Sequence, residues 1–335
     1  MELQNYPSQE IPKSEIIDQV IEWLYLIGAL RAALDLQLWE KISAGQDTAG
    51  KMASQQGWDP TGTRVLLDTI CALKLLNKVG DRYFLIPEAA CYLIPGKRTY
   101  KGGLLQNEFN WEGNGQLAQA IRSGKRPMHY NATTAEMVNI WIADYSRRWV
   151  NPESYFETDE KLWQSLEIRP RDGLRVLDLA CGPAPCSMAL ARKHAGVRLT
   201  WLDWEEILQT ALNTAAHLGI ENQVSLLPGD LWSVEFENSQ YDLAYLGNVT
   251  HFFSLEENIR LFRKVFASLK PGGEIVVNSV ARQEMDEVGF IDLWLYAATA
   301  TGRAYGFRDY RGMLERAGYR DIRDINHGPI KARKP

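Results

Sequence analysis

Three aspartates and one histidine stand at the ends of apolar runs, where an α/β protein can place reactive side chains. Asp178 lies in LDLACGPAP, Asp203 ends the next apolar run and Asp230 ends a third. His251 follows a fourth run, in NVTHFF. Ligands of open parallel sheets bind at the carboxyl ends of the strands. We therefore expect these side chains at one edge of a sheet.

The stretch LDLACGPAP has the shape of a nucleotide-binding loop but lacks the G-x-G-x-x-G pattern that cradles a pyrophosphate. It contains one glycine, Gly182, while Pro183 and Pro185 remove two backbone N–H donors that phosphates would need. A cofactor without phosphates fits this loop better. The pattern favours S-adenosylmethionine (SAM), with Asp203 on its ribose.

From residue 174 onward, predicted strands alternate with predicted helices. The runs RVLDLA, VRLTWLD, QVSLLPGD, YDLAYLGNV and EIVVNSV are typical of strands. The runs CSMALARKHAG, EEILQTALNTAAHLG and LEENIRLFRKVFASLK are typical of helices, the second with a glycine stop at Gly219. This alternation predicts a parallel sheet with helices on both faces.

The first part of the chain has a different pattern. Residues 16–93 show mostly helical spacing, with a helix expected to start after Asp59 and a β-hairpin expected to turn at Gly80. Helices followed by a two-stranded wing describe a winged helix. Winged helices often bind DNA, but the helix after Asp59 carries only Arg64 and Lys74 as cations. We therefore expect dimerisation rather than phosphate binding.

Composition excludes several classes of protein. The chain has 335 residues and a formal net charge of -5, so no global basic field would attract nucleic acid or an anionic membrane. No run approaches the length of a membrane-spanning helix, and the polar N-terminus is unlike a signal peptide. The four cysteines lack metal-site spacing. We expect a cytoplasmic protein with reduced thiols and no structural metal.

Six motifs in order resemble those of class I methyltransferases: LDLACGPAP, LTWLDWEEI, LGIENQVSLLPGDLW, NVTHFFSLEENIRLF, LKPGGEIVV and RGMLERAGYRDI. From about residue 16 to the end, the chain resembles the plant-type small-molecule O-methyltransferases and their bacterial relatives. The resemblance implies a Rossmann-like SAM-binding domain with a mixed, mostly parallel seven-stranded sheet, preceded by a mainly helical winged-helix domain. The implied boundaries are 1–95 for a homodimerising domain, 96–165 for a helical linker that contributes to the substrate pocket, and 166–335 for the SAM-binding domain.

The resemblance also implies site residues. Those expected to bind the cofactor are Asp178, Ala180, Gly182, Asp203, Trp204, Asp230, Leu231, Trp232 and Asn248. His251 falls on the family's catalytic histidine and is expected to act as general base. An aromatic pocket for the substrate is expected from Trp111, Trp141, Tyr145, Phe252 and Trp294.

Departures from the family pattern keep several alternatives open. Alanine stands at position 184 where a glycine is usual, and Phe252 replaces a substrate-binding aspartate. No carboxylate is expected beside His251, because the corresponding strand end reads Asn278-Ser279. We expect SAM-dependent methylation of a small aromatic or polycyclic secondary metabolite, at oxygen, with S-adenosylhomocysteine (SAH) as product. The alternatives are C- or N-methylation, a SAM-binding enzyme of the same fold that does not methylate, and a winged-helix regulator that senses a ligand.

Overall fold

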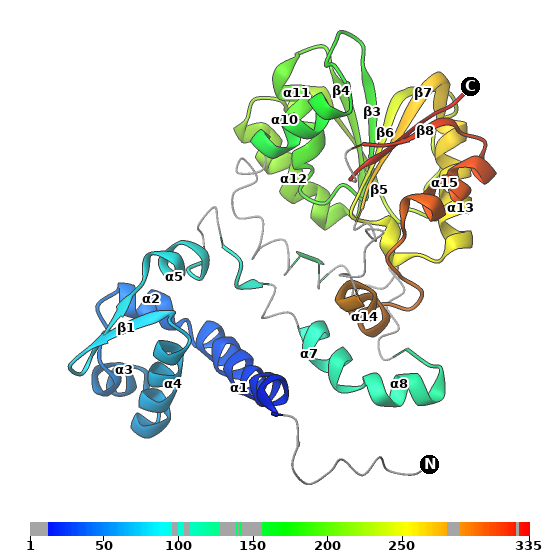
Figure 1. The fold of residues 1–335 in the computed structure, drawn as a ribbon. Helices are drawn as coiled ribbons and strands as arrows, with labels where there is room; N and C mark the ends of the chain where they lie inside the picture. The colour runs from blue at the N-terminus through cyan, green and yellow to red at the C-terminus, as the bar shows by residue number, and fades with distance from the viewer. Residues whose placement is uncertain are drawn as a thin grey trace, which may run out of the picture. The chain divides into compact units, whose positions relative to one another are not determined.

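The structure, a computed structural model, describes residues 13–95, 100–103, 108–126, 139, 141–142, 156–279, 289–325 and 328–335. The chain divides into two compact units, Met1–Gln106 and Asn107–Pro335, each of which is described here by itself (Figure 1). The three-part division expected from the sequence stays a prediction, because much of 96–165 lies outside the described ranges. Within those ranges, no helix is both long enough and apolar enough to cross a membrane.

The first unit combines helices with one hairpin. Its described elements are α1 (Glu15–Asp35), α2 (Leu38–Ser43), α3 (Ala49–Gln56), α4 (Pro60–Ala72), β1 (Leu76–Val79), β2 (Arg82–Leu85) and α5 (Pro87–Tyr92). The side chain of Asp59 accepts a hydrogen bond from the Gly62 N–H and caps α4, with proline in the first turn. Strands β1 and β2 pair in antiparallel register around Gly80, whose φ is 63°. The predicted helix start and hairpin are confirmed.

The second unit is built on one sheet. Its strands are β3 (Arg175–Leu179), β4 (Arg198–Asp203), β5 (Val224–Pro228), β6 (Tyr241–Gly247), β7 (Leu269–Asn278), β8 (Arg320–Asp324) and β9 (Ile330–Arg333). They lie in the order β5-β4-β3-β6-β7-β9-β8. Strands β3 to β7 pair in parallel, and β9 runs antiparallel to both β7 and β8. The mixed, mostly parallel seven-stranded sheet is therefore confirmed.

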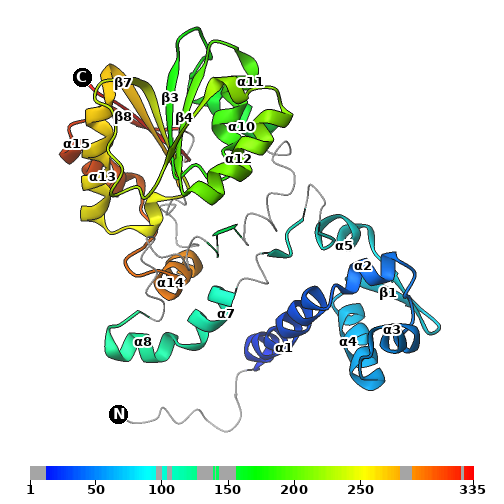
Figure 2. The same ribbon diagram turned by 180° about the vertical axis from the view of Figure 1, so that it is seen from behind.

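Helices cover both faces of this sheet. The described helices of the unit are α7 (Glu108–Gly115), α8 (Leu117–Ser123), α10 (Phe156–Ser165), α11 (Pro185–Lys193), α12 (Glu205–His217), α13 (Leu255–Ser268), α14 (Gly289–Ala298) and α15 (Phe307–Ala317), with the short 3-10 turns η2 (Glu221–Gln223) and η3 (Thr250–Phe252). Figures 1 and 2 show α10, α11 and α12 on one face and α13 and α15 on the other. Each face buries its own apolar cluster against the sheet.

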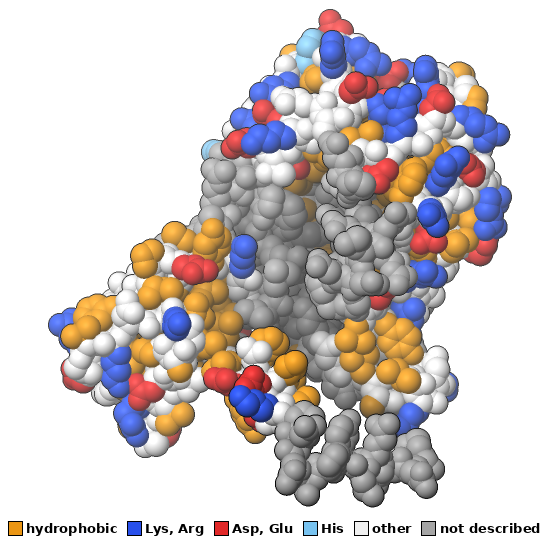
Figure 3. Space-filling model, in the orientation of Figure 1, with side chains coloured by type: hydrophobic (Ala, Val, Ile, Leu, Met, Phe, Trp, Pro, Cys, Tyr) orange, Lys and Arg blue, Asp and Glu red, His pale blue; other side chains and the backbone are white. Residues whose placement is uncertain are grey.

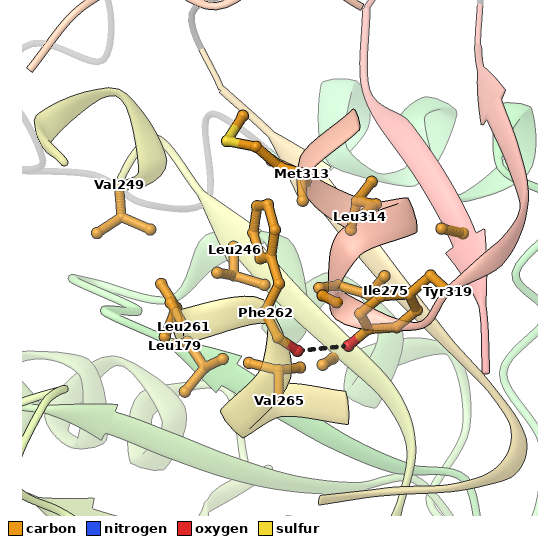
Figure 4. Close-up of a cluster of buried hydrophobic side chains, with 14 of the residues drawn as sticks. Leu179, Leu246, Val249, Leu261, Phe262, Val265, Ile275, Met313, Leu314 and Tyr319 are labelled. Carbon is orange, nitrogen blue, oxygen red and sulfur yellow. Dashed lines mark hydrogen bonds between the residues drawn. The ribbon is translucent and has the colours of Figure 1, made fainter. Parts of the chain in front are cut away.

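The cluster beneath α13 and α15 fixes the half of the sheet that carries β6 and β7. Phe262 of α13, Leu314 of α15 and Ile275 of β7 are fully buried in it (Figure 4). The Tyr319 hydroxyl donates a hydrogen bond to the Phe262 carbonyl at 3.2 Å. This packing positions the carboxyl end of β6, from which the chain enters η3.

A capping box starts α13 directly after η3. The Ser254 hydroxyl accepts from the Glu257 N–H, and the Glu257 carboxylate accepts from the Ser254 N–H. The chain direction immediately after His251 is thereby set by local hydrogen bonds.

The topology determines where a ligand can bind. The chain runs from β3 through β4 to β5 at one edge, then returns to β6 on the other side of β3. Strand order therefore reverses between β3 and β6. In open α/β sheets, the crevice for a ligand forms at the carboxyl ends of the strands at this point.

Candidate functional site

The loop after β3 is tied to the end of β4 by a buried carboxylate. The Gly182 N–H donates to one oxygen of Asp203 at 2.8 Å, and the Trp204 N–H donates to the other at 2.8 Å. Asp203 is 7% exposed. Its side chain therefore fixes both the loop and the start of α12.

Alternate residues of this loop have left-handed backbone. The φ angles are 51° at Ala180, 56° at Gly182 and 55° at Ala184. A residue with a Cβ loses roughly 1 kcal/mol in this region compared with glycine. Alanine stands at two of the three positions, and Ala184 is buried. Alanine at 184 therefore costs free energy compared with glycine.

Burial dominates the electrostatics of the two aspartates. Asp178 is buried on β3, where its carboxylate accepts from the Ser187 hydroxyl. Burial above all, together with the charges of the nearby Asp203 and Asp159 carboxylates, raises the pKa of Asp178 to about 7, against the lowering effect of the Ser187 hydrogen bond. Burial also raises the pKa of Asp203 to about 6, against the lowering effect of its two N–H donors. A cationic ligand beside these groups would favour their ionised forms.

The turn after β5 is held by a hydrogen bond and by contacts of an aromatic ring. Asp230 accepts from the Trp232 N–H at 2.7 Å, and Leu231 between them is buried. The Trp232 ring meets Phe253 edge-on at 4.9 Å between centroids, and the Arg260 guanidinium lies 4.4 Å above it. A buried side chain and a fixed aromatic ring thus stand beside the carboxyl end of β5.

Asn248 lies at the carboxyl end of β6. The residue is exposed, and its backbone is left-handed, with a φ of 54°. Its N–H donates to the Asn278 carbonyl at the end of β7. Its side chain is therefore available at the edge where the ligand crevice is expected.

His251 is buried in η3, four residues after β6. The residue is only 3% exposed, and its Nδ1 lies 2.8 Å from the Ser279 hydroxyl oxygen. Burial lowers the pKa of His251 to about 4. The imidazole is therefore neutral at physiological pH.

The partner of His251 is one that sequence reasoning did not identify. The sequence predicted only that no carboxylate lies beside His251. In the structure, the hydroxyl of Ser279 lies there instead. Ser279 also hydrogen-bonds Tyr310, whose hydroxyl lies 2.7 Å from that of Thr250. The histidine thus ends a chain of neutral hydroxyl groups.

Three of the expected substrate residues meet around this histidine. The Phe252 ring lies 4.3 Å from the His251 ring, 5.5 Å from Trp141 and 6.3 Å from Trp294, measured between centroids. Trp111 lies on α7, which packs against α14, the helix that carries Trp294. Trp111 is 46% exposed. The structure therefore gathers Phe252, Trp141 and Trp294 into one aromatic wall.

Tyr145, also expected to bind the substrate, lies outside the described residues.

The site fits SAM. Each oxygen of Asp203 accepts one backbone N–H, which leaves lone pairs for the two hydroxyls of a ribose. The buried carboxylates of Asp178 and Asp203 suit a positively charged ligand. In the part of the chain that is described, no three His, Cys, Asp or Glu side chains are grouped to hold a metal ion.

Comparison with known proteins supports this assignment. Residues 176–273 match the methyltransferase domain family. The chain is 24% identical over 321 residues to 3-hydroxy-5-methyl-1-naphthoate 3-O-methyltransferase of Streptomyces sahachiroi, covering 90% of this chain and 88% of that protein. The fold is shared with a protein of Nostoc punctiforme PCC 73102 assigned to the O-methyltransferases. The TM-score is 0.81 and the identity 21%, and the match covers 97% of this chain and 100% of that protein. It is also shared with human N-acetylserotonin methyltransferase in complex with SAM. The TM-score is 0.72 and the identity 21%, and the match covers 98% of this chain and 99% of that protein.

The raised pKa of Asp178 predicts how stability depends on pH. The pKa of Asp178 in the folded protein lies above its unfolded value. The stability that this group contributes when protonated is therefore lost as pH rises from about 4 through about 7. We expect Asp178→Asn to raise the free energy of unfolding of the ligand-free protein at pH 8 by an amount on the order of 2 kcal/mol, and by much less at pH 5. Chemical denaturation at both pH values measures the difference. Equal effects at the two values would show that Asp178 is already ionised at low pH.

Proposed function

We propose that this chain, which belongs to the SAM-dependent small-molecule O-methyltransferases, transfers a methyl group to a hydroxyl oxygen of a planar aromatic or polycyclic metabolite. One observation carries the proposal: a buried, neutral His251 and the aromatic ring of Phe252 follow β6, the strand next to β3 and its cofactor loop. The naphthoate substrate named for the Streptomyces relative supports an aromatic acceptor.

Residues at the ends of β3, β4, β5 and β6 hold the cofactor in this proposal. When bound, SAM supplies a methyl carbon on a positively charged sulfur. Asp203 would accept hydrogen bonds from the ribose, with Trp204 beside it. Leu231 and Trp232, next to Asp230, would hold the adenine. Asp178, Ala180 and Gly182 would bind the methionine part, and Asn248 stands at the same edge.

His251 takes the proton of the acceptor hydroxyl. Its Nδ1 is occupied by Ser279, so the free ring nitrogen is Nε2. Nε2 can accept a proton only if Nδ1 carries the ring hydrogen and donates it to the serine oxygen. Ser279 therefore acts as a positioning residue that orients the ring, and its hydroxyl oxygen can accept the hydrogen of Nδ1 in this tautomer.

The low pKa of His251 determines when the proton moves. A phenol has a pKa near 10 and His251 has one of about 4. Complete transfer of the phenol proton to His251 before methyl transfer would therefore cost about 8 kcal/mol. As the oxygen gains the methyl group it becomes a far stronger acid. The proton consequently moves to Nε2 during or after methyl transfer, and the main contribution of the site is to position the oxygen.

A second copy of the chain is the partner that the N-terminal unit requires. Within its own unit, α1 buries only Ala33 and Leu34, near its C-terminal end. Figure 3 shows hydrophobic side chains on the visible face of the N-terminal unit. The exposed apolar residues of the helix are Ile16, Ile17, Val20, Ile21, Trp23, Leu24, Tyr25 and Ile27. A continuous apolar surface of this kind is typical of a dimer interface, and we infer a homodimer formed through this unit.

We place the enzyme in the cytoplasm. All four cysteines have free thiols, and burial holds the pKa of Cys181 and Cys186 well above its usual value. Reduced, unreactive thiols fit a reducing compartment.

The cofactor assignment predicts that Asp203→Ala weakens binding of SAH at least tenfold, because the ribose loses its acceptor and the Gly182 amide loses its partner. Isothermal titration calorimetry measures the affinity. Asp172→Asn, which changes an aspartate whose side chain is 94% exposed, serves as the control. Unchanged affinity in Asp203→Ala would remove Asp203 from the site.

The base assignment predicts that His251→Ala lowers kcat by about 10²- to 10⁴-fold while the affinity for SAH stays within about twofold. The wild-type kcat should stay constant from pH 8 to about 5.5, since the pKa of His251 is about 4. Ser279→Asp should raise the pKa of His251 and move the acid limb of kcat toward neutral pH. Mass spectrometry and NMR of the product identify the methylated atom. Full turnover in His251→Ala would rule out the base role, and a C- or N-methylated product would correct the acceptor.

The dimer proposal predicts that Ile17→Asp combined with Leu24→Asp converts the protein to a monomer, because the two charges would be buried at the interface. Light scattering after size-exclusion chromatography measures the mass. Val79→Asp, at an exposed apolar residue of the wing, is the matched control and should remain dimeric. A dimeric double variant would show that α1 is not the interface.

A further inference from the structure

A buried polar network lies beside the cofactor loop on the α10 and α11 side of the sheet. The Asn278 amide donates to the Tyr245 hydroxyl at 3.0 Å, and that hydroxyl donates to the Cys186 sulfur at 3.1 Å. The Cys186 thiol in turn donates to Asp159 Oδ1 at 2.9 Å. Cys186 lies in the first turn of α11, and its carbonyl accepts from the Trp163 indole at 2.7 Å. This chain of donors ends at the carboxylate of Asp159.

The carboxylate of Asp159 is incompletely satisfied. The residue is 8% exposed, and its Oδ2 is buried with no hydrogen-bond partner among the described residues. The single donor on the other oxygen is a thiol, which is a weak one. A buried carboxylate in this state is costly unless a stronger donor or a cation completes it.

Asp159 and Asp203 are buried carboxyl groups that both act on a third, Asp178. The charges of Asp159 and Asp203 each raise the pKa of Asp178. No lysine or arginine in the described parts of the chain forms an ion pair with any of the three. The cofactor loop is thus bordered by buried acids that the described residues leave without a positive partner.

We propose that Asp159 is a further cofactor-binding residue that, together with Asp178, accepts hydrogen bonds from the ammonium group at the methionine end of SAM. The proposal rests on the cofactor assignment and adds a residue to it. An ammonium group has three N–H donors, whereas the sulfonium has no hydrogen to donate. The ribose hydroxyls already have Asp203 as acceptor. The unpartnered oxygen of Asp159 therefore matches the ammonium among the polar groups of the ligand.

The experiment measures how much of the affinity depends on the ligand's ammonium. SAH and its deaminated analogue, in which hydrogen replaces the α-amino group, are titrated into wild type and Asp159→Asn by calorimetry. The asparagine keeps an oxygen for the Cys186 thiol. We expect Asp159→Asn to bind SAH at least tenfold more weakly than wild type, and the deaminated analogue within about twofold of wild type.

Glu157→Gln provides the matched control, since it removes a carboxylate from the same helix at an exposed position paired with Lys161. Its affinity for both ligands should equal that of wild type. An equal loss of both ligands in Asp159→Asn would assign Asp159 a purely structural role and overturn the proposal.

The wild-type titrations keep the proposal testable if Asp159→Asn does not fold. Removal of the ammonium should then cost at least tenfold in affinity, and a cost below threefold would overturn the proposal. If wild type bound neither SAH nor its analogue, the cofactor assignment would fail first, which is a distinguishable result.

Discussion

The site depends on the hydrogen bonds that join the Asp203 carboxylate to the Gly182 and Trp204 amides. They connect the loop after β3 to the end of β4, next to the point between β3 and β6 where strand order reverses. To make them, the protein buries a charged group whose pKa rises to about 6 as a result. The raised pKa of Asp178 beside it follows from the same burial. A cationic ligand relieves both costs, so the arrangement that shapes the loop also selects the charge of its ligand.

Those features that local patterns specify were predictable from the sequence. The strand–helix alternation, the start of α4 after Asp59 and the hairpin at Gly80 depend on neighbouring residues. The three aspartates, Asp178, Asp203 and Asp230, and His251 were also placed correctly at the carboxyl edge, since parallel strands bring their ends together. Their roles toward cofactor and substrate stay predictions.

What the sequence did not indicate depends on contacts between distant elements. The Ser279 hydroxyl reaches His251 from the end of β7, 28 residues away in the chain. Asp159 meets Cys186 only because α10 packs against α11, 27 residues on. In both cases the residue type gave no signal, because a serine or an aspartate in an isolated stretch is most often exposed.

The aromatic wall and the neutral histidine have one physical cause. Packing of Phe252 and Trp294 around His251 removes water from the ring, which lowers its pKa and makes it a weak base. A neighbouring carboxylate would stabilise the imidazolium, whereas the Ser279 hydroxyl can only orient the ring. A weak, well-oriented base suits an acceptor whose proton becomes acidic as the methyl group arrives. The same apolar surface that weakens the base can hold a planar ring, so binding and orientation of the acceptor compensate for the lost basicity.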